Sequence, residues 1–459
     1  MLISRFVWVS MVIGGIRANV VVIGGGITGL VAGYELARLG FRVTVLEKDE
    51  VVGGIAGSFE VNWSRVDKFY HHFFNSDEHL IRLAGEIGLG NQLRYAPTKT
   101  SIYIGKGFFR LSSPLDVLRF RPLGLVDRVR LGMLVLKARG LADWRPLESE
   151  TAEQWLVGRC GRRVYSVVWE PLLRAKFGSF AREVSAVWFW NKLVLRGGSR
   201  NSVGNEMLGY VNGSFGAMVE VLADKIRAFG GEVQVGVPAK SLLVEGDCIR
   251  GVRTPNGSIN AVAVIATPAM PIIAGLLDGG VSQEYISGLR RIRYLANVCL
   301  VLELSKPISD IYWLNINDPD VPFTGIVEHT NLLPINACGG RHIVYLSKYL
   351  EQDSEVYNMS EGKLLEFFVP YVKRIFAGFE REQILGYHVF KSPYAQPLVE
   401  CHYSKFICPT ETPIRGFYIA TMAQVYPQDR GVNYAVAQGR QVAKTAARYL
   451  CYSETGTGK

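Results

Sequence analysis

Apolar and polar positions near the start of the chain are arranged in a way that predicts a strand, a helix and a second strand. Residues 20–23 are a β-branched apolar run, and a glycine-rich turn follows them. Residues 30–39 place apolar side chains at helical spacing, and residues 43–46 form a second apolar run. Two short apolar runs around an amphipathic segment are typical of a parallel βαβ unit. We therefore expect an α/β domain to begin at residue 19.

Further along the chain, the same patterns predict a helix, a strand, a hairpin and an apolar strand in close succession. These elements cover residues 213–231, 232–238, 240–254 and 261–266. Other predicted helices cover residues 77–90 and 114–139, the second broken at Pro122, and a last helix runs to about residue 450. Other predicted strands cover residues 98–109, 294–304 and 416–421.

The glycine turn after the first strand has the spacing of a dinucleotide-binding site. Gly24 lets the chain turn sharply, Gly26 lets the backbone approach a pyrophosphate, and Gly29 lets the helix pack on the sheet. The helix N-terminus directs free N–H groups at that phosphate. Glu47 ends the second strand, where its carboxylate accepts from ribose hydroxyls. A glycine-rich turn in an ordinary α/β unit is the alternative. The predicted contacts are Gly24, Gly26, Ile27, Thr28, Gly29, Glu47 and Lys48.

A second glycine pair, Gly53 and Gly54, follows Glu47, and Ser58 comes four residues after the pair. The stretch from Glu47 to Ser58 resembles the E-x5-G-G-x3-[S/T] signature of the amine oxidase, protoporphyrinogen oxidase and phytoene desaturase superfamily. The glycine pair lets the chain lie against the ribityl and pyrophosphate groups of a flavin without side-chain interference. Many relatives carry arginine after the pair, where this chain has Ile55. A phosphate contact common in the superfamily is therefore absent or comes from another residue.

This resemblance implies FAD, bound in an extended conformation and without a covalent link. It also implies a Rossmann-like FAD-binding domain of the GR2 type, with an inserted α+β substrate domain. The FAD-binding domain would comprise residues 19–76, 209–270 and 405–452. The substrate domain would comprise residues 77–208 and 271–404.

Two later segments resemble the remaining cofactor contacts of the superfamily. The strand that ends at Val237 corresponds to one that lies against the adenine, and Thr267 ends the next apolar strand. Arg430, Gly431 and Val432 lead into the last helix, whose N-terminus faces the flavin ribityl and pyrophosphate groups in the superfamily. The resemblance assigns Arg430 and the Gly431 amide to phosphate and to flavin O2.

The chain departs from the superfamily pattern at two further places. A Gly-Asp pair usually follows the last strand, but residues 422–423 are Met-Ala. The acid that often meets the ribityl chain is therefore absent or is Asp429. In amine oxidases proper, a lysine near the strand at residues 294–304 holds a water at flavin N5. Here that strand has no lysine, which argues against amine oxidation itself.

Residues 66–74 resemble the segment of the superfamily, and of UDP-galactopyranose mutase, that passes beneath the isoalloxazine. Adjacent side chains of an extended segment point to opposite faces, so at most one of His71 and His72 faces the ring. One interpretation is a polar or proton-handling group at the flavin. The other is a pair of hydrogen-bonded structural histidines.

Aromatic and basic residues gather at residues 169–178 and 188–192. Aromatic walls such as Trp188, together with Arg174 or Lys176, suit an anionic, partly apolar substrate held over the flavin. The same aromatic residues also suit an ordinary core. We therefore expect a small-molecule substrate, with an anionic one among the alternatives.

Three further residues are candidate catalytic groups. Glu328 and His329 are able to act as acid, base or hydrogen-bond partner, and a structural role is the alternative for both. Tyr394 lies in a segment that resembles the superfamily's last substrate-domain turn, where an aromatic residue often faces the ring.

Length and charge set further limits. A chain of 459 residues exceeds one ordinary core, and its net charge of +10 is a true excess. We expect no nucleic-acid partner, because the sequence has no basic tail and no nucleic-acid-binding module.

The seven cysteines contain no C-x-x-C pair, which argues against a zinc site and favours the reducing cytoplasm. We expect no metal, and we expect residues 1–18 to be a disordered extension of the fold.

Residues 114–139 interleave leucines with six basic residues. This composition suits a basic amphipathic surface that docks on a membrane. A helix pair with one solvated face is the commoner arrangement and the one that we favour. We therefore expect a cytoplasmic protein, with peripheral membrane contact as an open alternative.

Together these patterns predict an FAD-dependent oxidoreductase that removes a hydride from a C–N or C–C bond of a small or medium-sized substrate. The alternative is an enzyme that resembles UDP-galactopyranose mutase and acts on a nucleotide sugar through reduced FAD. A non-catalytic FAD-binding relative is the third hypothesis. The substrate, the electron acceptor and the oligomeric state stay open.

Overall fold

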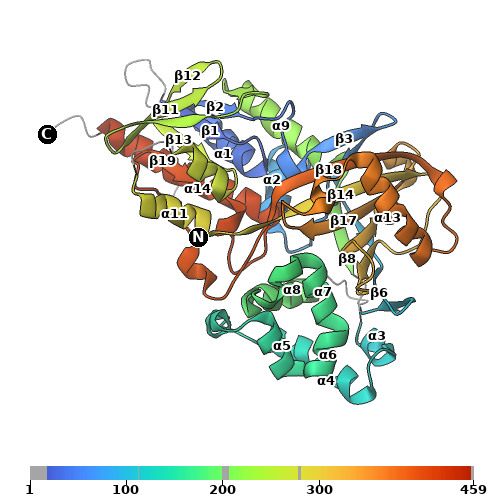
Figure 1. Cartoon of the computed structure of the whole chain (residues 1–459). Helices are drawn as coiled ribbons and strands as arrows, with labels where there is room; N and C mark the ends of the chain where they lie inside the picture. Colours follow the sequence, from blue (N-terminus) through green and yellow to red (C-terminus); the bar gives the residue numbers. More distant parts are fainter. Residues whose placement is uncertain (1–17, 112, 199–205, 278–280, 456–459) are drawn as a thin grey trace, which may run out of the picture.

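The computed structural model describes residues 18–111, 113–198, 206–277 and 281–455. The extension predicted for residues 1–18 lies outside these ranges, except for its last residue. The described elements form three groups: a sheet with helices at the upper left of Figure 1, a second sheet at the right, and a group of helices below.

Five parallel strands form the first sheet, in the order β19-β13-β1-β2-β9. Strands from the beginning, the middle and the end of the chain therefore lie side by side, and this confirms the predicted Rossmann-like α/β fold. The strands are β1 (Asn19–Ile23), β2 (Arg42–Leu46), β9 (Glu232–Gln234), β13 (Ala263–Ala266) and β19 (Phe417–Ile419).

Different elements cover the two faces of this sheet. Val20 and Val22 of β1 pack with helices α1, α9 and α14, whereas Val21 and Ile23 pack with helix α10 and the hairpin strands β10 and β11. This follows from the alternation of side chains along a strand. The bounds are α1 (Ile27–Arg38), α9 (Ser214–Ala228), α10 (Met270–Leu276), α11 (Gln283–Arg291), α14 (Val432–Thr455), β10 (Ser241–Glu245), β11 (Cys248–Thr254) and β12 (Gly257–Asn260).

The second sheet has seven strands, in the order β18-β14-β17-β16-β15-β6-β7. The long strand β14 (Tyr294–Leu304) pairs on both sides, with β17 and β18. Its Val298, Leu300 and Leu302 pack with helix α13 (Glu361–Ile375), whereas Cys299 and Val301 pack with residues of the first group. The other strands are β6 (Thr100–Ile104), β7 (Gly107–Arg110), β15 (Trp313–Ile316), β16 (Gly325–Glu328), β17 (His342–Leu350) and β18 (Ile384–Pro397).

The third group is helical and projects at the lower end of the molecule in Figure 1. The predicted break at Pro122 is confirmed, because it separates two of these helices. The helices are α3 (Pro114–Arg119), α4 (Leu125–Arg139), α5 (Ala152–Cys160), α6 (Arg162–Val164), α7 (Glu170–Phe177) and α8 (Ala186–Gly198).

Helix α2 (Glu78–Glu86), which our prediction places in the substrate domain, packs on α14. The Leu80 N–H donates to Asn433 Oδ1 at 3.1 Å, and Arg440 forms an ion pair with Glu86. The remaining short elements are β3 (Ser58–Val61), β4 (Ser64–Asp67), β5 (Leu93–Pro97), β8 (Met207–Val211) and α12 (Glu355–Asn358).

Asp67, at the end of β4, links strand β8 and helix α9 to the second sheet. Its carboxylate accepts from Tyr210 OH at 2.6 Å and from the Phe215 N–H, at the start of α9, at 3.0 Å. Its carbonyl oxygen accepts from Tyr345 OH of β17 at 2.7 Å. Burial raises the pKa of Asp67 to about 7, although these donors oppose the shift. The segment that follows Asp67 therefore begins at a fixed point between α9 and the second sheet.

Candidate functional site

The turn after β1 requires glycine at two positions. Gly24 has a φ of +102°, and its N–H donates to the Leu46 carbonyl at 2.8 Å. A Cβ on Gly29 would lie 1.9 Å from the Gly24 carbonyl oxygen. Only glycine therefore allows the turn and the close packing of α1 against it.

Gly26 and Gly54 border an open space that we call the glycine cradle. A Cβ on Gly26 would meet no atom within 4 Å, and one on Gly54 would meet only the Gly26 Cα, at 3.8 Å. The two loops are held together, because the Gly53 N–H donates to the Gly25 carbonyl at 2.8 Å. Gly26 caps α1 without a side-chain hydrogen bond, so the first N–H groups of the helix stay available. The cradle fits a pyrophosphate.

Glu47 lies buried beside the cradle. Its Oε2 accepts from the Gly25 N–H at 2.8 Å, and its Oε1 accepts from the Asp49 N–H at 3.0 Å. Each oxygen keeps capacity for another hydrogen bond, so the carboxylate fits ribose hydroxyls. The Val237 N–H donates to the Glu47 carbonyl at 2.8 Å, which brings the predicted adenine segment next to this acid.

The other predicted cofactor residues of this region lie in different surroundings. Thr267 Oγ1 donates to the Ile23 carbonyl at 2.9 Å, directly at the glycine turn. Ser58 lies against α9, since a Cβ on Gly216 would be 2.1 Å from its hydroxyl. Lys48 pairs with the neighbouring aspartate at 2.6 Å, and its side chain is 65% exposed. The Lys48 ammonium therefore faces solvent.

Helix α14 brings a second N-terminus into this region. A Cβ on Gly439 would lie 2.6 Å from the Thr28 carbonyl oxygen, so α14 and α1 cross very closely. Val432, at the start of α14, lies about two turns before this crossing. A Cβ on Gly431 would meet nothing within 4 Å. Two helix N-termini next to open space favour a negatively charged ligand.

His71 and His72 face different neighbours. The His71 ring lies 5.5 Å from the Phe215 ring, and burial, with a smaller contribution from the Arg430 charge, lowers the pKa of His71 to about 4. Its Nδ1 is buried and has no hydrogen-bond partner among the described residues. His72 Nδ1 instead lies 3.2 Å from Tyr312 OH. His71 is therefore the histidine that retains an open position for a ligand.

Arg430, directly before the start of α14, is partly buried. Its Nε donates to Gln396 Oε1 at 3.1 Å, and its Nη2 donates to Tyr349 OH at 2.9 Å. Both acceptors are neutral, so these hydrogen bonds orient the guanidinium, whose charge is opposed in part by that of Asp429. The cation remains able to stabilise an anion beside His71.

Asp429 is the acid of this region, and it is 7% exposed. It accepts from Trp188 Nε1 at 3.0 Å and forms an ion pair with Lys192. Burial would raise the pKa of Asp429, but the charges of Lys192, Lys176 and Arg430 outweigh it and hold the pKa well below its usual range. We call these side chains the Asp429 cluster.

Lys176 approaches the cluster through aromatic rings. Its Nζ lies 4.9 Å from the ring centroid of Trp188 and 5.1 Å from that of Tyr349. An ammonium over aromatic faces is attracted by their quadrupoles. The structure therefore brings Lys176, Trp188 and Arg430, three of the predicted site residues, into one place.

A group of neutral polar side chains lies on the face of the second sheet that is opposite α13. Tyr70 OH donates to Ser347 Oγ at 3.2 Å, and Asn297 Nδ2 donates to the same oxygen at 2.9 Å. Asn297 Oδ1 is buried without a partner in the described part of the chain. Asn297 lies on β14, on the side of Cys299 and away from α13. A buried acceptor of this kind fits a hydrogen bond from a ligand.

Comparison with known families shows which family the chain belongs to. Residues 27–447 match the family described as flavin containing amine oxidoreductase, which is nearly the whole chain. The chain belongs to this family. Its cofactor is FAD, as the two glycine motifs predicted, and the glycine cradle, Glu47 and the two helix N-termini fit the dinucleotide.

Individual relatives are more distant. Amine oxidase B of Cavia porcellus is 25% identical over 248 residues, which are 50% of this chain and 47% of that protein. The matched segment thus spans about half of the relative. An oxidoreductase from Methanosarcina mazei has a TM-score of 0.74 at 18% identity, over 93% of this chain and 100% of that one. Reduced UDP-galactopyranose mutase has a TM-score of 0.75 at 14% identity, over 94% of each chain. These likenesses establish the fold.

Arg174 and Tyr394, which were predicted to meet the substrate or the flavin ring, lie outside the Asp429 cluster. Arg174 is 60% exposed and pairs with Glu170 at 2.8 Å, so it does not join Lys176. Tyr394 is half-buried on β18 and packs edge-on against the Tyr294 ring at 5.4 Å. It lies where the register of β18 against β14 shifts, between the partners of Leu295 and Asn297.

Glu328 is saturated by donors from one loop. Its carboxylate is 1% exposed and accepts from the Ile308 N–H at 3.0 Å, the Ser309 N–H at 2.9 Å and the Ser309 hydroxyl at 2.8 Å. Burial raises the pKa of Glu328 to about 7. In this structure Glu328 anchors the loop after β14.

His329 is enclosed by aromatic rings, and neither of its ring nitrogens has a hydrogen-bond partner among the described residues. The ring lies 4.8 Å from that of Tyr210 and 5.6 Å from that of Tyr345. Burial, with a smaller contribution from His71, lowers the pKa of His329 to about 3. The folded protein therefore holds this imidazole neutral.

We expect His329→Phe to flatten the dependence of stability on pH. Below about pH 6.5 the unfolded chain binds a proton that folded His329 does not accept until about pH 3. Relative to the variant, the free energy of unfolding of the wild type should therefore fall by up to about 1.4 kcal/mol per pH unit as the pH decreases through this window. Urea unfolding between pH 4 and pH 7 measures the difference, and exposed His79→Phe is the matched control. Equal slopes for wild type and variant would contradict the prediction.

Several residues of the site were missed by sequence reasoning. Asn191 accepts from the Asp429 N–H at 3.1 Å, and it lies with Lys192 in the aromatic stretch that was singled out. Gln396 lies in the segment around Tyr394. No local motif marks Tyr349 or Asn297, because their partners come from other parts of the chain.

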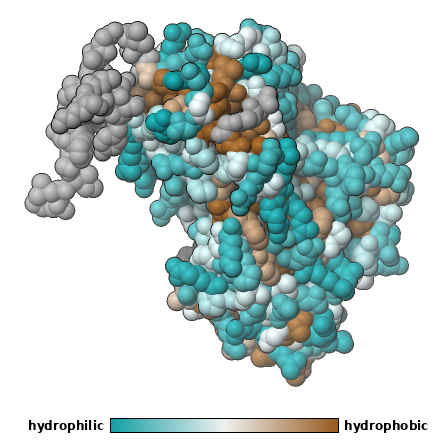
Figure 2. Space-filling model, turned by 60° about the vertical axis from the view of Figure 1, so that its left-hand side comes forward, coloured by the Kyte–Doolittle hydropathy of each residue, from teal (hydrophilic) through white to brown (hydrophobic). Residues whose placement is uncertain are grey.

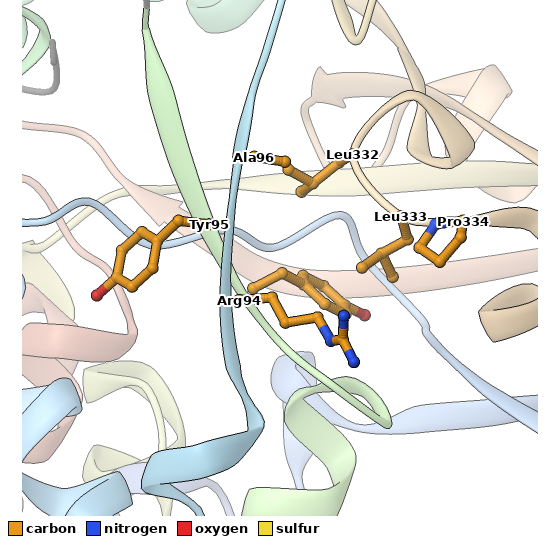
Figure 3. A pocket seen from close by; sticks show the side chains of 7 residues that line it. Arg94, Tyr95, Ala96, Leu332, Leu333 and Pro334 are labelled. Carbon is orange, nitrogen blue, oxygen red and sulfur yellow. The ribbon is translucent and has the colours of Figure 1, made fainter.

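A separate pocket of about 290 Å³ lies beside strand β5. In Figure 3, Arg94 extends to the side of the strand on which Leu333 and Pro334 lie, whereas Tyr95 points to the other side. None of its lining residues was predicted to bind cofactor or substrate. The lining residues are Arg94, Tyr95, Ala96, Tyr210, Leu332, Leu333 and Pro334.

Proposed function

We propose that this flavin oxidoreductase removes a hydride from a C–N or C–C bond of a substrate that carries an anionic group. The observation that supports this proposal most directly is the position of Arg430, whose described hydrogen bonds go to neutral Gln396 and Tyr349. Bound FAD supplies a hydride acceptor, and accepting a hydride adds negative charge to its ring system. Arg430 is a fixed cation, oriented in advance, and it stabilises such charge without reorganisation.

The substrate class follows from the surroundings of Arg430. Lys176, Trp188 and Tyr349 combine one further cation with two aromatic surfaces, which suits an anionic and partly apolar molecule. β14 carries Asn297 and no lysine. A primary amide does not ionise near neutral pH and carries no positive charge, so this position favours a C–C bond over an amine.

Anaerobic mixing of the purified holoprotein with three substrate classes tests the proposal. Amines, porphyrinogens and polyenes are added separately, and loss of the oxidised flavin absorption is followed. We expect bleaching with a carboxylated porphyrinogen or polyene and little bleaching with amines. A protein whose flavin is reduced by dithionite but by none of the three classes would contradict the redox proposal.

Arg430→Gln should slow flavin reduction about tenfold and make the reduction potential more negative. Removal of a donor in direct contact with developing charge typically lowers the rate by about 10²–10³-fold. We expect a smaller decrease here, because Arg430 already donates to two side chains. Arg430→Lys should retain most of the rate. Arg415→Gln, which breaks an exposed ion pair with Asp247, is the matched control. An unchanged potential in Arg430→Gln would argue against this role.

A redox-neutral reaction on a nucleotide sugar is the second candidate. It is favoured by the two cations, Arg430 and Lys176, that approach the Tyr349 ring from within 5.9 Å and 5.1 Å, since a diphosphate requires such positive charge. Conversion of UDP-galactopyranose that requires the flavin to be reduced beforehand with dithionite, but consumes no reductant per turnover, would establish it. Absence of conversion by the fully reduced protein would exclude it.

A further inference from the structure

Helix α4 is apolar on two opposite sides. Leu131, Leu134 and Ala138 are buried inside the helical group. A second set of apolar side chains is exposed and falls within an arc of about 100° on the other side of the helix. We call this set the outer face of α4. It comprises Leu125 at 73%, Val126 at 66%, Val129 at 58%, Met133 at 44% and Leu136 at 63% exposure.

The neighbouring helix α3 extends this surface. Leu115 and Leu118 are 51% and 55% exposed. Arg128 ties the two helices together, because its Nη1 donates to the Leu118 carbonyl at 2.7 Å and its Nε to the Leu123 carbonyl at 2.8 Å. The outer face and the α3 leucines are therefore held in a fixed arrangement.

Figure 2 shows apolar side chains among polar ones at the lower end of the molecule, the end that α3 and α4 form in Figure 1. Scattered exposed apolar residues are ordinary in soluble proteins, whereas a contiguous apolar face marks an interaction surface. Five large apolar side chains on one side of a single helix are such a face.

Basic residues flank the outer face. On a helical projection, Arg130 and Lys137 lie along one edge of the apolar arc, and Arg128 and Arg139 lie beyond the other edge. Residues 114–139 contain six basic and two acidic residues, which gives a net charge of +4. One of the acids, Asp127, already pairs with Arg130 and Arg163. The surface is therefore apolar in its centre and positive at its rim.

We propose that α3 and the outer face of α4 dock this protein on an anionic lipid bilayer, with α4 lying in the plane of the interface. The apolar side chains would enter the boundary between headgroups and acyl chains, and the flanking cations would meet the lipid phosphates. The charge argues against a second copy of the chain as the occupant, since two such faces would bring like charges together. No helix in the described part of the chain is long and apolar enough to cross a bilayer.

Flotation of the holoprotein with vesicles tests this proposal. We expect it to float with vesicles of phosphatidylcholine and phosphatidylglycerol, to float weakly with phosphatidylcholine alone, and to be released by salt. Val129→Asp/Met133→Asp should lower partitioning at least about tenfold. Lys137→Gln/Arg139→Gln should lower partitioning to anionic vesicles about tenfold at low salt. Val262→Asp/Leu385→Asp changes two exposed apolar residues elsewhere and is the matched control.

Three results would overturn the proposal. The first is failure of the wild type to float with anionic vesicles. The second is an equal loss in the control variant. The third is a dimer, detected by sedimentation velocity, that Val129→Asp/Met133→Asp dissociates without any effect on vesicle binding, since a second copy would then cover the face. Flavin content and thermal unfolding verify that each variant is folded.

Discussion

A Gly26→Val variant is expected to fold normally and to be purified without its flavin. A Cβ at this position meets no atom within 4 Å, and the φ of −76° and ψ of 176° suit a β-branched residue. The valine side chain would instead occupy the glycine cradle, where the pyrophosphate of FAD fits. We expect the dissociation constant for FAD to rise at least about a hundredfold, which is about 3 kcal/mol. Titration of the apoprotein with FAD, followed by flavin fluorescence, measures it.

Two other glycines serve as controls for this prediction. Gly29→Val should fail to accumulate as folded protein, because its Cβ would lie 1.9 Å from a backbone oxygen. Gly288→Val, on the exposed side of α11, should bind FAD with the affinity of the wild type, since a Cβ there also meets nothing within 4 Å. If Gly26→Val binds FAD as tightly as Gly288→Val, the cradle does not hold the pyrophosphate.

The parts of the fold that sequence reasoning predicted best depend on local patterns. The predicted strand at residues 294–304 has the bounds of β14, because eleven mainly apolar positions between polar ones specify a buried strand by themselves. The first βαβ unit and the family are also recognisable, since the glycines of the turn act within a few residues of each other. Gly24 has a positive φ, and Gly29 leaves no room for a Cβ. Both requirements arise within the turn itself, so the sequence of the turn reveals them.

The side chains of the substrate site were harder to predict, because helical position decides which of two similar residues faces inward. Arg174 and Lys176 are two positions apart on α7, so they point in directions about 200° apart. Lys176 reaches Trp188, while Arg174 pairs with Glu170 at the surface. The presence of many aromatic and basic residues in this segment does not indicate which side of helix α7 faces the core.

Long-range partners were beyond sequence reasoning for a different reason. Arg430 is oriented by Tyr349 and Gln396, which come from β17 and β18. Nothing in the local sequence of these strands marks them as partners of a residue at the start of α14. The outer face of α4 shows the same limit, because the leucine spacing fits either a buried or an exposed side.

Asp429→Asn is expected to lower the free energy of unfolding by about 3 kcal/mol, at the low end of the cost of breaking a buried ion pair. The carboxylate is 7% exposed, and it compensates Lys192, which is 36% exposed at its side chain, as well as Lys176 and Arg430. Asparagine can still accept from Trp188 Nε1, so the lost charge, and not a lost hydrogen bond, causes the effect. Urea unfolding measures it, and Asp247→Asn in the exposed pair with Arg415 should leave the midpoint unchanged.

A second change and the pH dependence separate charge from packing at this position. Lys192→Met added to Asp429→Asn should restore part of the stability, because it removes a cation that the variant leaves uncompensated. The pKa of Asp429 in the folded protein lies below its value of about 4 in the unfolded chain. The stability that the carboxylate contributes to the fold is therefore complete above about pH 4 and is lost as the pH falls toward the folded pKa. The gap between wild type and Asp429→Asn should therefore be constant from about pH 5 to pH 8 and should narrow below about pH 4. A gap that does not depend on pH or on Lys192 would mean that shape, and not charge, makes the Asp429 cluster stable.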